Sequence, residues 1–269
     1  MSTMIEKFEG DHITDTLITA AAEFFTLNYG VWGPLAANKI GVKEGTPRIS
    51  SRLMVRKSLS CSETLLTPES VGARVRMSSR ILKEKILPPD AVNIYVRMLG
   101  NDGKLIGNAF ATRWTYDNRL MLWVTQLCVS KHHRNQGIAK KLLQELRHDS
   151  DYGVGILSSH PFAISAVLRV FGSGLEKTDL EVIRQQAQAV MKSCPVEYVS
   201  GAGLRGTLFE KSETLDNVIS CADTKFWVDH KEPLTALDII KEKGAIWPFG
   251  NLPEGHEFLA LVSRSGHVL

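Results

Sequence analysis

A short polar loop between an apolar strand and an amphipathic helix has the residue types that bind phosphate groups. The strand ends at Val129, and the loop enters the helix through Arg134-Asn135-Gln136-Gly137-Ile138-Ala139. A loop that turns directly into a helix points several unpaired backbone N–H groups at one place, and the helix dipole adds positive potential there. Small residues at positions 137 and 139 let a phosphate reach those amides. The sequence therefore predicts a cradle for a polyanion.

Two lysines, Lys140 and Lys141, follow in the first turn of the expected helix. Cations at this end oppose the helix dipole, at a cost of about 0.3–1 kcal/mol each. A bound polyanion would remove that conflict. Both lysines are equally compatible with the exposed face of an amphipathic helix, and we include Lys140 among the expected phosphate ligands.

The loop and the strand before it resemble the coenzyme-binding signature of the GNAT superfamily of acyl-CoA-dependent N-acetyltransferases. The similarity rests on Leu127-Cys128-Val129, followed by Arg134-x-x-Gly137-x-Ala139. In that family the loop amides hold the diphosphate of coenzyme A, and the pantetheine arm pairs with the strand much like an added β-strand. The resemblance therefore implies acetyl-CoA as co-substrate, bound by Leu127, Cys128, Val129, Arg134, Asn135, Gln136, Gly137, Ile138, Ala139 and Lys140.

Alternation of apolar and polar residues predicts three antiparallel strands before the loop. Residues 92–98 alternate with period two, and residues 101–103 (Asn-Asp-Gly) form a tight-turn signal. Strands over residues 105–114 and 120–129 follow. The third strand of this meander thus ends where the loop begins.

The pattern changes to alternating helix and strand after the loop. The first helix is expected to bury Ile138, Leu142, Leu143 and Leu146. A short apolar strand over residues 152–158 is typical of a parallel strand reached through a helical crossover. A second helix begins at Pro161 and ends at Gly172. This order predicts an α/β fold (α+β, with a mixed sheet), and it resembles the GNAT core over about residues 90–172.

The flanking segments are expected to extend this core within one domain spanning residues 1–269. Helices are predicted before it, within residues 1–90, and an elaboration after it, over residues 173–269. The predicted helices cover residues 13–27, 79–87, 178–192 (with a capping box from Thr178 to Glu181) and 233–243, the predicted strands cover 225–230 and 257–262, and residues 196–222 are expected to be irregular. Residues 35–75 suggest no clear element.

Composition excludes several classes of protein. Hydrophobic residues make up 43% of the 269 residues, which is ample for a normal core, and the net charge of +3 does not suggest a nucleic-acid surface. Four cysteines, Cys61, Cys128, Cys194 and Cys221, show no CxxC spacing. We therefore expect reduced thiols, no metal and a cytoplasmic location. No apolar run is long enough to span a membrane, and the N-terminus is too charged for a secretory leader.

The resemblance also defines what the chemistry needs. An alkyl amine with a pKa of about 10.4 is mostly protonated at neutral pH, so a base or a desolvating pocket is useful. A bulge in the strand ending at Val129 would leave an amide free for the oxyanion. Many family members carry a carboxylate on this strand, whereas no Asp or Glu occurs here over residues 120–129. The general base is therefore unassigned.

Four polar residues are candidates for proton transfer. His160 is the strongest, because it follows the C-terminal end of the parallel strand, where open α/β sheets gather ligands. It also occupies the place of the family's helix-starting Asn, although a plain helix cap explains it equally well. The family's later tyrosine is replaced by Val167. Asp229 and His230 form a second candidate pair, and Asp117 is a third candidate.

These observations predict an N-acetyltransferase that moves the acetyl group of acetyl-CoA directly to a primary amine of a small molecule in a ternary complex. Cys128 is expected to be a buried strand residue and not a nucleophile. The alternatives are a protein amine acetyltransferase and a non-catalytic acyl-CoA sensor or scaffold. A nucleotide-binding domain is disfavoured because the full G-x-x-x-x-G-K-[ST] pattern is absent. The whole chain resembles fungal GNAT members of unassigned substrate, and an exposed C-terminal strand could make it a homodimer.

Overall fold

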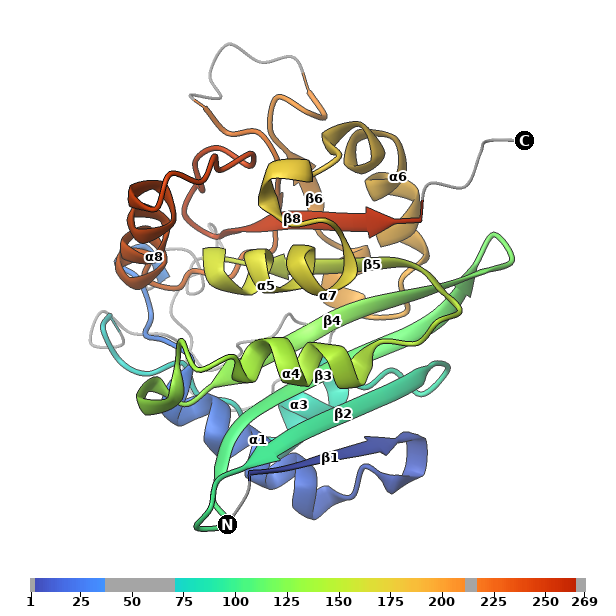
Figure 1. Cartoon of the computed structure of the whole chain (residues 1–269), viewed down its shortest axis with the longest axis vertical. Helices are drawn as coiled ribbons and strands as arrows, with labels where there is room; N and C mark the ends of the chain where they lie inside the picture. The colour runs from blue at the N-terminus through green and yellow to red at the C-terminus, as the bar shows by residue number, and fades with distance from the viewer. Residues whose placement is uncertain (1–2, 37–70, 211–216, 265–269) are drawn as a thin grey trace, which may run out of the picture.

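One mixed eight-stranded sheet runs through the structure, a computed structural model that describes residues 3–36, 71–210 and 217–264. The strand order is β1-β2-β3-β4-β5-β8-β7-β6, and β4 and β5 are the parallel pair among the described strands (Figure 1). The strands are β1 (Met4–Glu9), β2 (Val92–Leu99), β3 (Leu105–Tyr116), β4 (Arg119–Val129), β5 (Asp151–Ser158), β6 (Gly203–Arg205), β7 (Cys221–Asp223) and β8 (His256–Ser263). The predicted α/β class with a mixed sheet is confirmed.

Helices cover both faces of this sheet (Figure 1). They are α1 (Asp15–Asn28), α3 (Ser79–Ile86), α4 (Ile138–Leu146), α5 (Pro161–Phe171), α6 (Leu180–Ser193), α7 (Glu197–Ser200) and α8 (Lys231–Glu242). Side-chain caps begin α1 and α3, where Thr14 and Ser78 accept backbone N–H groups. Burial of the predicted apolar stripe of α4 is confirmed.

The meander agrees with the sequence prediction, except that β2 is buried on both faces at its centre. Tyr95, expected on a polar face, is fully buried with Phe110 against Ile18 of α1 and Leu82 of α3. The prediction was wrong here because α1 and α3 cover this face, and periodicity within one strand cannot reveal such a cover.

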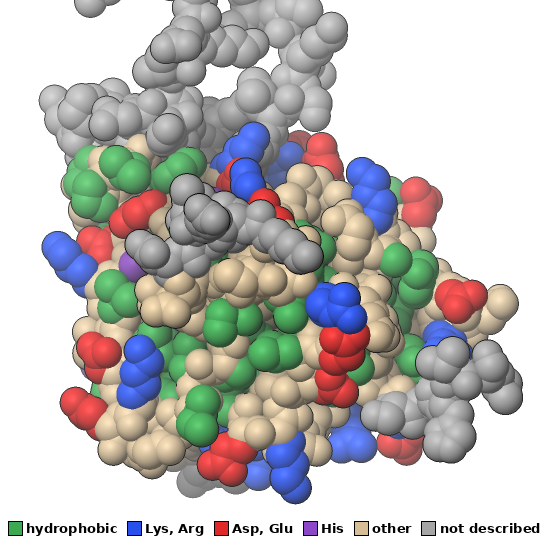
Figure 2. All heavy atoms as spheres, turned by 90° about the horizontal axis from the view of Figure 1, so that it is seen from above, with side chains coloured by type: hydrophobic (Ala, Val, Ile, Leu, Met, Phe, Trp, Pro, Cys, Tyr) green, Lys and Arg blue, Asp and Glu red, His purple; other side chains and the backbone are tan. Residues whose placement is uncertain are grey.

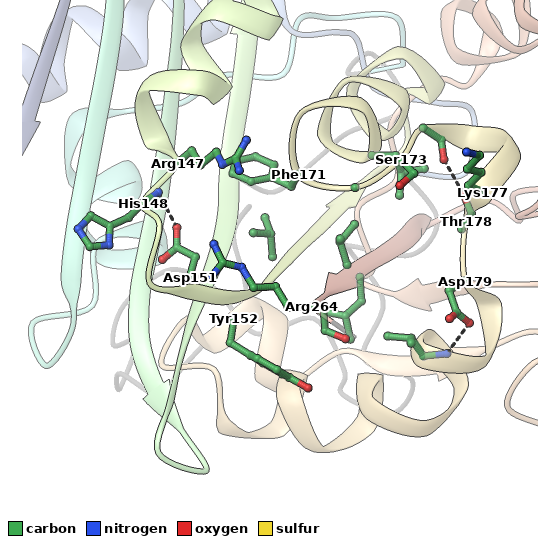
Figure 3. A pocket seen from close by; sticks show the side chains of 18 residues that line it. Arg147, His148, Asp151, Tyr152, Phe171, Ser173, Lys177, Thr178, Asp179 and Arg264 are labelled. Carbon is green, nitrogen blue, oxygen red and sulfur yellow. Dashed lines mark hydrogen bonds between the residues drawn. The ribbon is translucent and has the colours of Figure 1, made fainter. Parts of the chain in front are cut away.

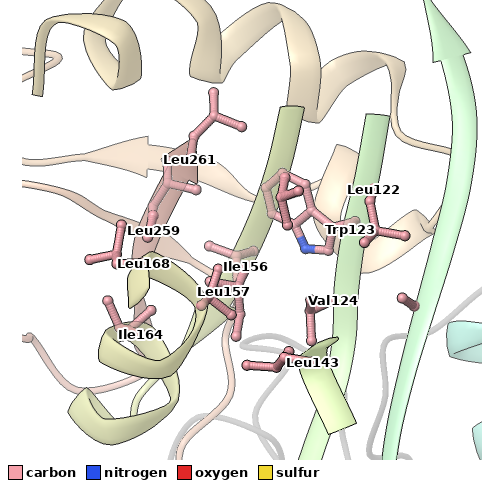
Figure 4. Packing of buried hydrophobic residues seen from close by; sticks show 14 of the residues in the cluster. Leu122, Trp123, Val124, Leu143, Ile156, Leu157, Ile164, Leu168, Leu259 and Leu261 are labelled. Atoms are coloured by element: carbon pink, nitrogen blue, oxygen red, sulfur yellow. The ribbon is translucent and has the colours of Figure 1, made fainter. Parts of the chain in front are cut away.

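The largest core cluster joins β4, β5 and β8 to α4 and α5 (Figure 4). Trp123 of β4 is fully buried in this cluster. A β-carbon at Gly155 would lie 2.2 Å from the Trp123 ring, so glycine at that position leaves room for the indole over β5. This packing fixes β4 and β5 side by side over the first half of their length.

Three predictions outside the core need correction, and one strand was missed. Residues 225–230 form no strand, because the short β7 at 221–223 pairs with β8 instead. Residues 196–222 are not wholly irregular, since they contain α7 and β6. Asp179, and not Thr178, caps α6. β1 was not predicted, although it pairs with β2 along its whole length. Residues 37–70, for which no element was predicted, lie outside the described residues.

The C-terminal strand is not an exposed edge. β8 pairs with β5 on one side and with β7 on the other, so the edges of the described sheet are β1 and β6. The premise of the suggested dimer, that β8 is an exposed edge, is therefore wrong, because β5 pairs with one side of β8 over residues 258–263 and β7 pairs with the other side over residues 256–258. On the face of the molecule seen in Figure 2, the described charged side chains of both signs are interspersed. No described helix has both the length and the apolarity needed to cross a bilayer.

Candidate coenzyme and catalytic site

The parallel strands β4 and β5 separate towards their C-terminal ends. Their pairing runs from Leu120 to Val124 on β4, whereas β4 itself continues to Val129. A bulge marks the point of separation, because the register with β3 passes from Val124 to Gln126 and leaves Thr125 as the extra residue. The bulge that would free an amide for the oxyanion is thus present in β4, at Thr125. Tyr198 of α7, which the sequence analysis did not single out, donates its hydroxyl to the Thr125 carbonyl at 3.1 Å.

Beyond the bulge, alternate backbone groups of β4 face the opening. The Ser130 N–H bonds the Ile106 carbonyl of β3 at 2.9 Å, and Cys128 faces Asn108 in the same register. Alternation in an antiparallel pair therefore turns the amides of Leu127 and Val129 away from β3, towards the gap left by β5. The Leu127 and Val129 N–H groups are therefore donors at the expected pantetheine position, whereas the Val129 carbonyl already accepts a long hydrogen bond, 3.5 Å, from Arg134 Nε.

A cavity of about 1030 Å³ occupies this opening. It reaches from the end of α1, at residues 28–31, across β4 and the loop to α5 and α8. Eleven of the fourteen predicted site residues line it: Leu127, Cys128, Val129, Arg134, Asn135, Gly137, Ile138, Ala139, Lys140, His160 and Asp229. Gln136, His230 and Asp117 do not line it. Lys140 lines the cavity whereas its neighbour Lys141 does not, which distinguishes the two lysines that the sequence left equivalent.

The loop before α4 has the geometry of an anion cradle. Asn135 and Gly137 both adopt left-handed backbone conformations, with φ of 62° and 77°. Alternating handedness of this kind turns successive N–H groups to one side. The first helical hydrogen bond is Lys141 N–H to the Gly137 carbonyl, so the amides of residues 138–140 have no partner within the helix. A β-carbon at Gly137 would meet nothing within 4 Å, which leaves the approach open.

Arg134 is held by groups from neighbouring segments. Its guanidinium forms an ion pair with Glu232 of α8 and donates to the Asn28 carbonyl at the end of α1, at 3.0 Å. Burial lowers the pKa of Arg134 from its usual value, but a guanidinium remains charged. Arg134 therefore ties the loop to α1 and α8, and Glu232 is a cavity residue that no sequence pattern singled out.

Residues 92–167 match the model of the GNAT acetyltransferase domain. This chain carries a GNAT acetyltransferase domain. By that match the protein is an acyl-CoA-dependent N-acetyltransferase. No curated protein matches the sequence.

Solved structures that resemble the acetyltransferase do so distantly. Arylalkylamine N-acetyltransferase 2 from Aedes aegypti is 12% identical, with 63% of this chain and 82% of that chain covered and a TM-score of 0.39. An aminoglycoside acetyltransferase from an uncultured soil metagenomic sample, in complex with sisomicin, is 12% identical, with 66% and 92% covered and a TM-score of 0.35. An aminoglycoside 6'-N-acetyltransferase complexed with coenzyme A is 14% identical, with 58% and 61% covered and a TM-score of 0.32. Likenesses this distant say nothing about the acceptor of the acetyltransferase.

Cys128 lies in the wall of the acetyltransferase cavity as a protonated thiol. Its side chain is buried, and burial raises the pKa of the thiol to about 12. A thiol with this pKa holds almost no thiolate at neutral pH. The geometry therefore disfavours an acyl-cysteine intermediate.

His160 caps α5 and lies at the cavity. Its Nδ1 accepts the Phe162 N–H at 3.3 Å, so the neutral ring carries its proton on Nε2, 3.6 Å from Glu232 Oε1. Burial, with a smaller contribution from Arg134, lowers the pKa of His160 to about 4. At neutral pH the cavity-facing nitrogen is thus a hydrogen-bond donor, which fits a contact with coenzyme better than a role as proton acceptor.

The lowered pKa of His160 makes stability depend on pH. The folded protein binds this proton near pH 4 and the unfolded chain near pH 6.5, so the unfolded state holds more protons between these values. The His160 contribution is complete above pH 6.5 and is lost as the pH falls to 4. After allowance for partial exposure we expect about 2 kcal/mol. His160→Asn keeps a cap acceptor but should flatten this slope in urea titrations, and an unchanged slope would contradict the assignment.

The remaining candidates occupy different places. Asp229 lines the cavity and accepts the Lys231 N–H at 2.7 Å at the start of α8. His230 is buried outside the cavity, with no hydrogen-bond partner for Nε2 among the described residues. Asp117 lies in the β3–β4 turn, outside the cavity lining. The chain therefore brings Asp229 and His160 together with the loop, and leaves His230 and Asp117 apart.

A buried carboxyl behind the cavity escaped the sequence analysis. Glu257 of β8 is 6% exposed, and burial raises its pKa to about 7, although the Ser159 N–H partly offsets this. Ser159 lines the cavity but Glu257 does not. The sequence signal that could have identified Glu257 was its position as a charged residue beside the apolar run of β8. No described group of three or more His, Cys, Asp or Glu side chains is arranged to hold a metal.

A second cavity, of about 350 Å³, lies at the other end of β5 (Figure 3). Arg147, Tyr152, Lys177 and Arg264 are among its lining residues, and Asp151 lies at its base (Figure 3). It contains none of the predicted site residues. Asp151 is paired with Arg113 of β3, so this end of the sheet is built around an internal ion pair.

Proposed function

We propose that the acetyltransferase transfers the acetyl group of acetyl-CoA to a primary amine of a small molecule, directly and within a ternary complex. One observation carries the proposal: the anion cradle at the tip of α4 and the free amides of Leu127 and Val129 line the same cavity. The first suits a diphosphate and the second suits the amide groups of pantetheine. In this proposal His160 donates a hydrogen bond to the coenzyme, and residues 1–269 act as one domain.

The acceptor would enter from the end of α1. That part of the cavity is lined by Tyr29 and Val31, and by Asp229 and Glu232 from the other side. Glu232 is already paired with Arg134, so Asp229 is the carboxylate of the two that can attract a cation. Asp229 keeps 17% of its side chain exposed, and its ion pair with Lys231 is long, at 3.9 Å. Asp229 is thus placed to attract an ammonium group.

Thioester turnover tests this function. We expect acetyl-CoA at about 100 times its dissociation constant to stabilise the protein by about 2.7 kcal/mol, and ATP to do much less. Release of the coenzyme thiol, followed with a thiol-reactive dye, should then depend on an amine from a panel of arylalkylamines, polyamines, aminoglycosides and peptides. Turnover with peptides alone would reassign the acceptor to proteins.

A non-catalytic acyl-CoA sensor is the second candidate. It is favoured by the lack of any carboxylate on β4 between Leu120 and Val129. Stabilisation by acetyl-CoA without thiol release from any amine would support it. Absence of both stabilisation and turnover would contradict both functions.

A further inference from the structure

The second cavity, at the start of β5, is separate from the coenzyme cavity. Its volume of about 350 Å³ lies within the range of small-molecule sites, and it shares no lining residue with the cavity of about 1030 Å³. Asp151, the first residue of β5, lines the second cavity, whereas Ser158, the last residue of β5, lines the coenzyme cavity. A molecule bound in the second cavity would therefore leave the coenzyme position free.

Three cationic side chains line the second cavity. Arg147 follows α4, Lys177 ends the short turn after α5, and Arg264 follows β8. All three residues are exposed, and none of their side chains forms an ion pair or a hydrogen bond with a described residue. Figure 3 shows Arg147 and Arg264 towards the Asp151 end of the cavity and Lys177 at the opposite end. Segments far apart in sequence thus bring three uncompensated positive charges to one hollow.

The carboxylates of the same cavity are already engaged. Asp151 accepts two hydrogen bonds from the buried Arg113, so this pair is close to neutral. Asp179 accepts two backbone N–H groups at the start of α6, at 3.0 Å and 3.1 Å. A concave surface with an excess of one charge concentrates the field and attracts ions of the opposite charge. The second cavity therefore favours an anion.

Part of the cavity wall is apolar. Val154, Leu168 and Leu261 line it, and each is at most 4% exposed. Leu168 and Leu261 belong to the core cluster of Figure 4, so the wall is continuous with the packed interior. A carbon chain would remove this surface from water, whereas an inorganic anion would leave it wet. The wall thus favours an organic anion over an inorganic one.

One polar atom in the wall lacks a partner. Ser263 lines the cavity, and its Oγ is buried without a hydrogen bond to any described residue. Buried polar atoms in native proteins are almost always hydrogen-bonded. Ser263 directly precedes Arg264, so a hydroxyl donor without an acceptor lies next to one of the three cations. An oxygen of a bound anion would supply that acceptor.

We propose that the second cavity is a binding site for a small organic acid. Arg147 and Arg264 hold the carboxylate, because a planar guanidinium matches the geometry of its two oxygens. The carbon chain of the acid covers the apolar wall, and Lys177 adds positive potential from the other end. The site goes beyond the proposed function, since no step of amine acetylation uses it.

Calorimetric titration with three probes tests the chemistry of the site. We expect hexanoate to bind the wild type, and acetate to bind at least about tenfold more weakly because it lacks the longer chain. Hexanamide has the chain without the charge, and it should also bind at least about tenfold more weakly than hexanoate. Absence of hexanoate binding would overturn the proposal. Equal binding of hexanoate and either other probe would overturn it as well.

Two variants locate the bound acid. Arg147→Met and Arg264→Met keep an apolar stem and remove the charge, so each should bind hexanoate about tenfold or more weakly than the wild type. Arg80→Met is the matched control, because Arg80 of α3 is 78% exposed and lines neither cavity. It should bind hexanoate as the wild type does. Normal hexanoate binding in both Arg147→Met and Arg264→Met would place the acid elsewhere and overturn the proposal.

Melting temperatures separate loss of binding from loss of folding. Since Arg147 and Arg264 are exposed and have no ion-pair partner among the described residues, both variants should melt with the wild type when hexanoate is absent. Hexanoate should then raise the melting temperature of the wild type and of Arg80→Met, and raise that of the two cavity variants less. Equal increases in all four proteins would contradict the site. Neither measurement needs acetyl-CoA, so a failure of the proposed function would leave this test intact.

Discussion

The Gly137→Glu variant is expected to bind acetyl-CoA at least about 100-fold more weakly than the wild type, a loss of about 2.7 kcal/mol. Two effects combine. Gly137 has φ of +77°, where a residue with a β-carbon is strained. The new carboxylate would also stand in the cradle, where it repels the diphosphate and competes for the amides. Isothermal titration with acetyl-CoA measures the change.

A second glycine supplies a matched control. Gly103, in the turn between β2 and β3, has φ of +75° and, like Gly137, open space around a built β-carbon. Gly103→Glu therefore carries the same backbone strain and the same new charge away from the cavity, and it should bind acetyl-CoA normally. Gly137→Ala separates strain from charge. If Gly137→Glu bound acetyl-CoA as tightly as Gly103→Glu, the assignment of the cradle would be wrong.

Removal of Asp151 is expected to destabilise the fold by about 3–5 kcal/mol, because it leaves a buried arginine uncompensated. Asp151 accepts two hydrogen bonds from Arg113, at 2.6 Å and 3.0 Å, and the two side chains are 3% and 10% exposed. Arg113 also donates to the Leu146 carbonyl at the end of α4. The pair thus joins β3 to the helix that carries the cradle. Urea denaturation of Asp151→Ala measures the loss.

A double variant distinguishes charge burial from packing. Arg113→Met combined with Asp151→Ala removes both charges, and replacement of a whole buried ion pair by apolar groups is often close to neutral. We therefore expect the double variant to regain much of the stability that Asp151→Ala loses. A double variant as unstable as Asp151→Ala, or a loss below about 1 kcal/mol for Asp151→Ala alone, would contradict this account.

The conformation of the loop before α4 was predictable because its signals are local. Left-handed Gly137, the switch from period two to helical spacing, and the apolar face of α4 all lie within 27 consecutive residues, 120–146. The parallel pairing of β5 followed from its short apolar run after a crossover helix. In each case neighbouring residues determine the backbone conformation, so a single sequence contains the information.

Contacts between distant segments were not predictable in this way. Arg134 was predicted as a phosphate ligand, and nothing in the sequence indicated its ion pair with Glu232, 98 residues away. Asp229 reaches the cavity and its neighbour His230 does not, because the start of α8 turns one inward and buries the other elsewhere. The polar sequence of β1 gives little indication of a strand, and β1 is a strand because it pairs with β2. These contacts depend on how distant parts of the chain pack against one another.

The amino-acid sequence by itself determined the fold class, the loop that turns into α4 and the strand that presents free amides beside it, since each follows from spacing along the chain. Tertiary structure alone decided which polar residues share the cavity and which are sealed beneath α1. Tyr95, Asn108 and Gln126 are far apart in sequence and unremarkable in pattern. The sheet places them on one face, where all three are buried.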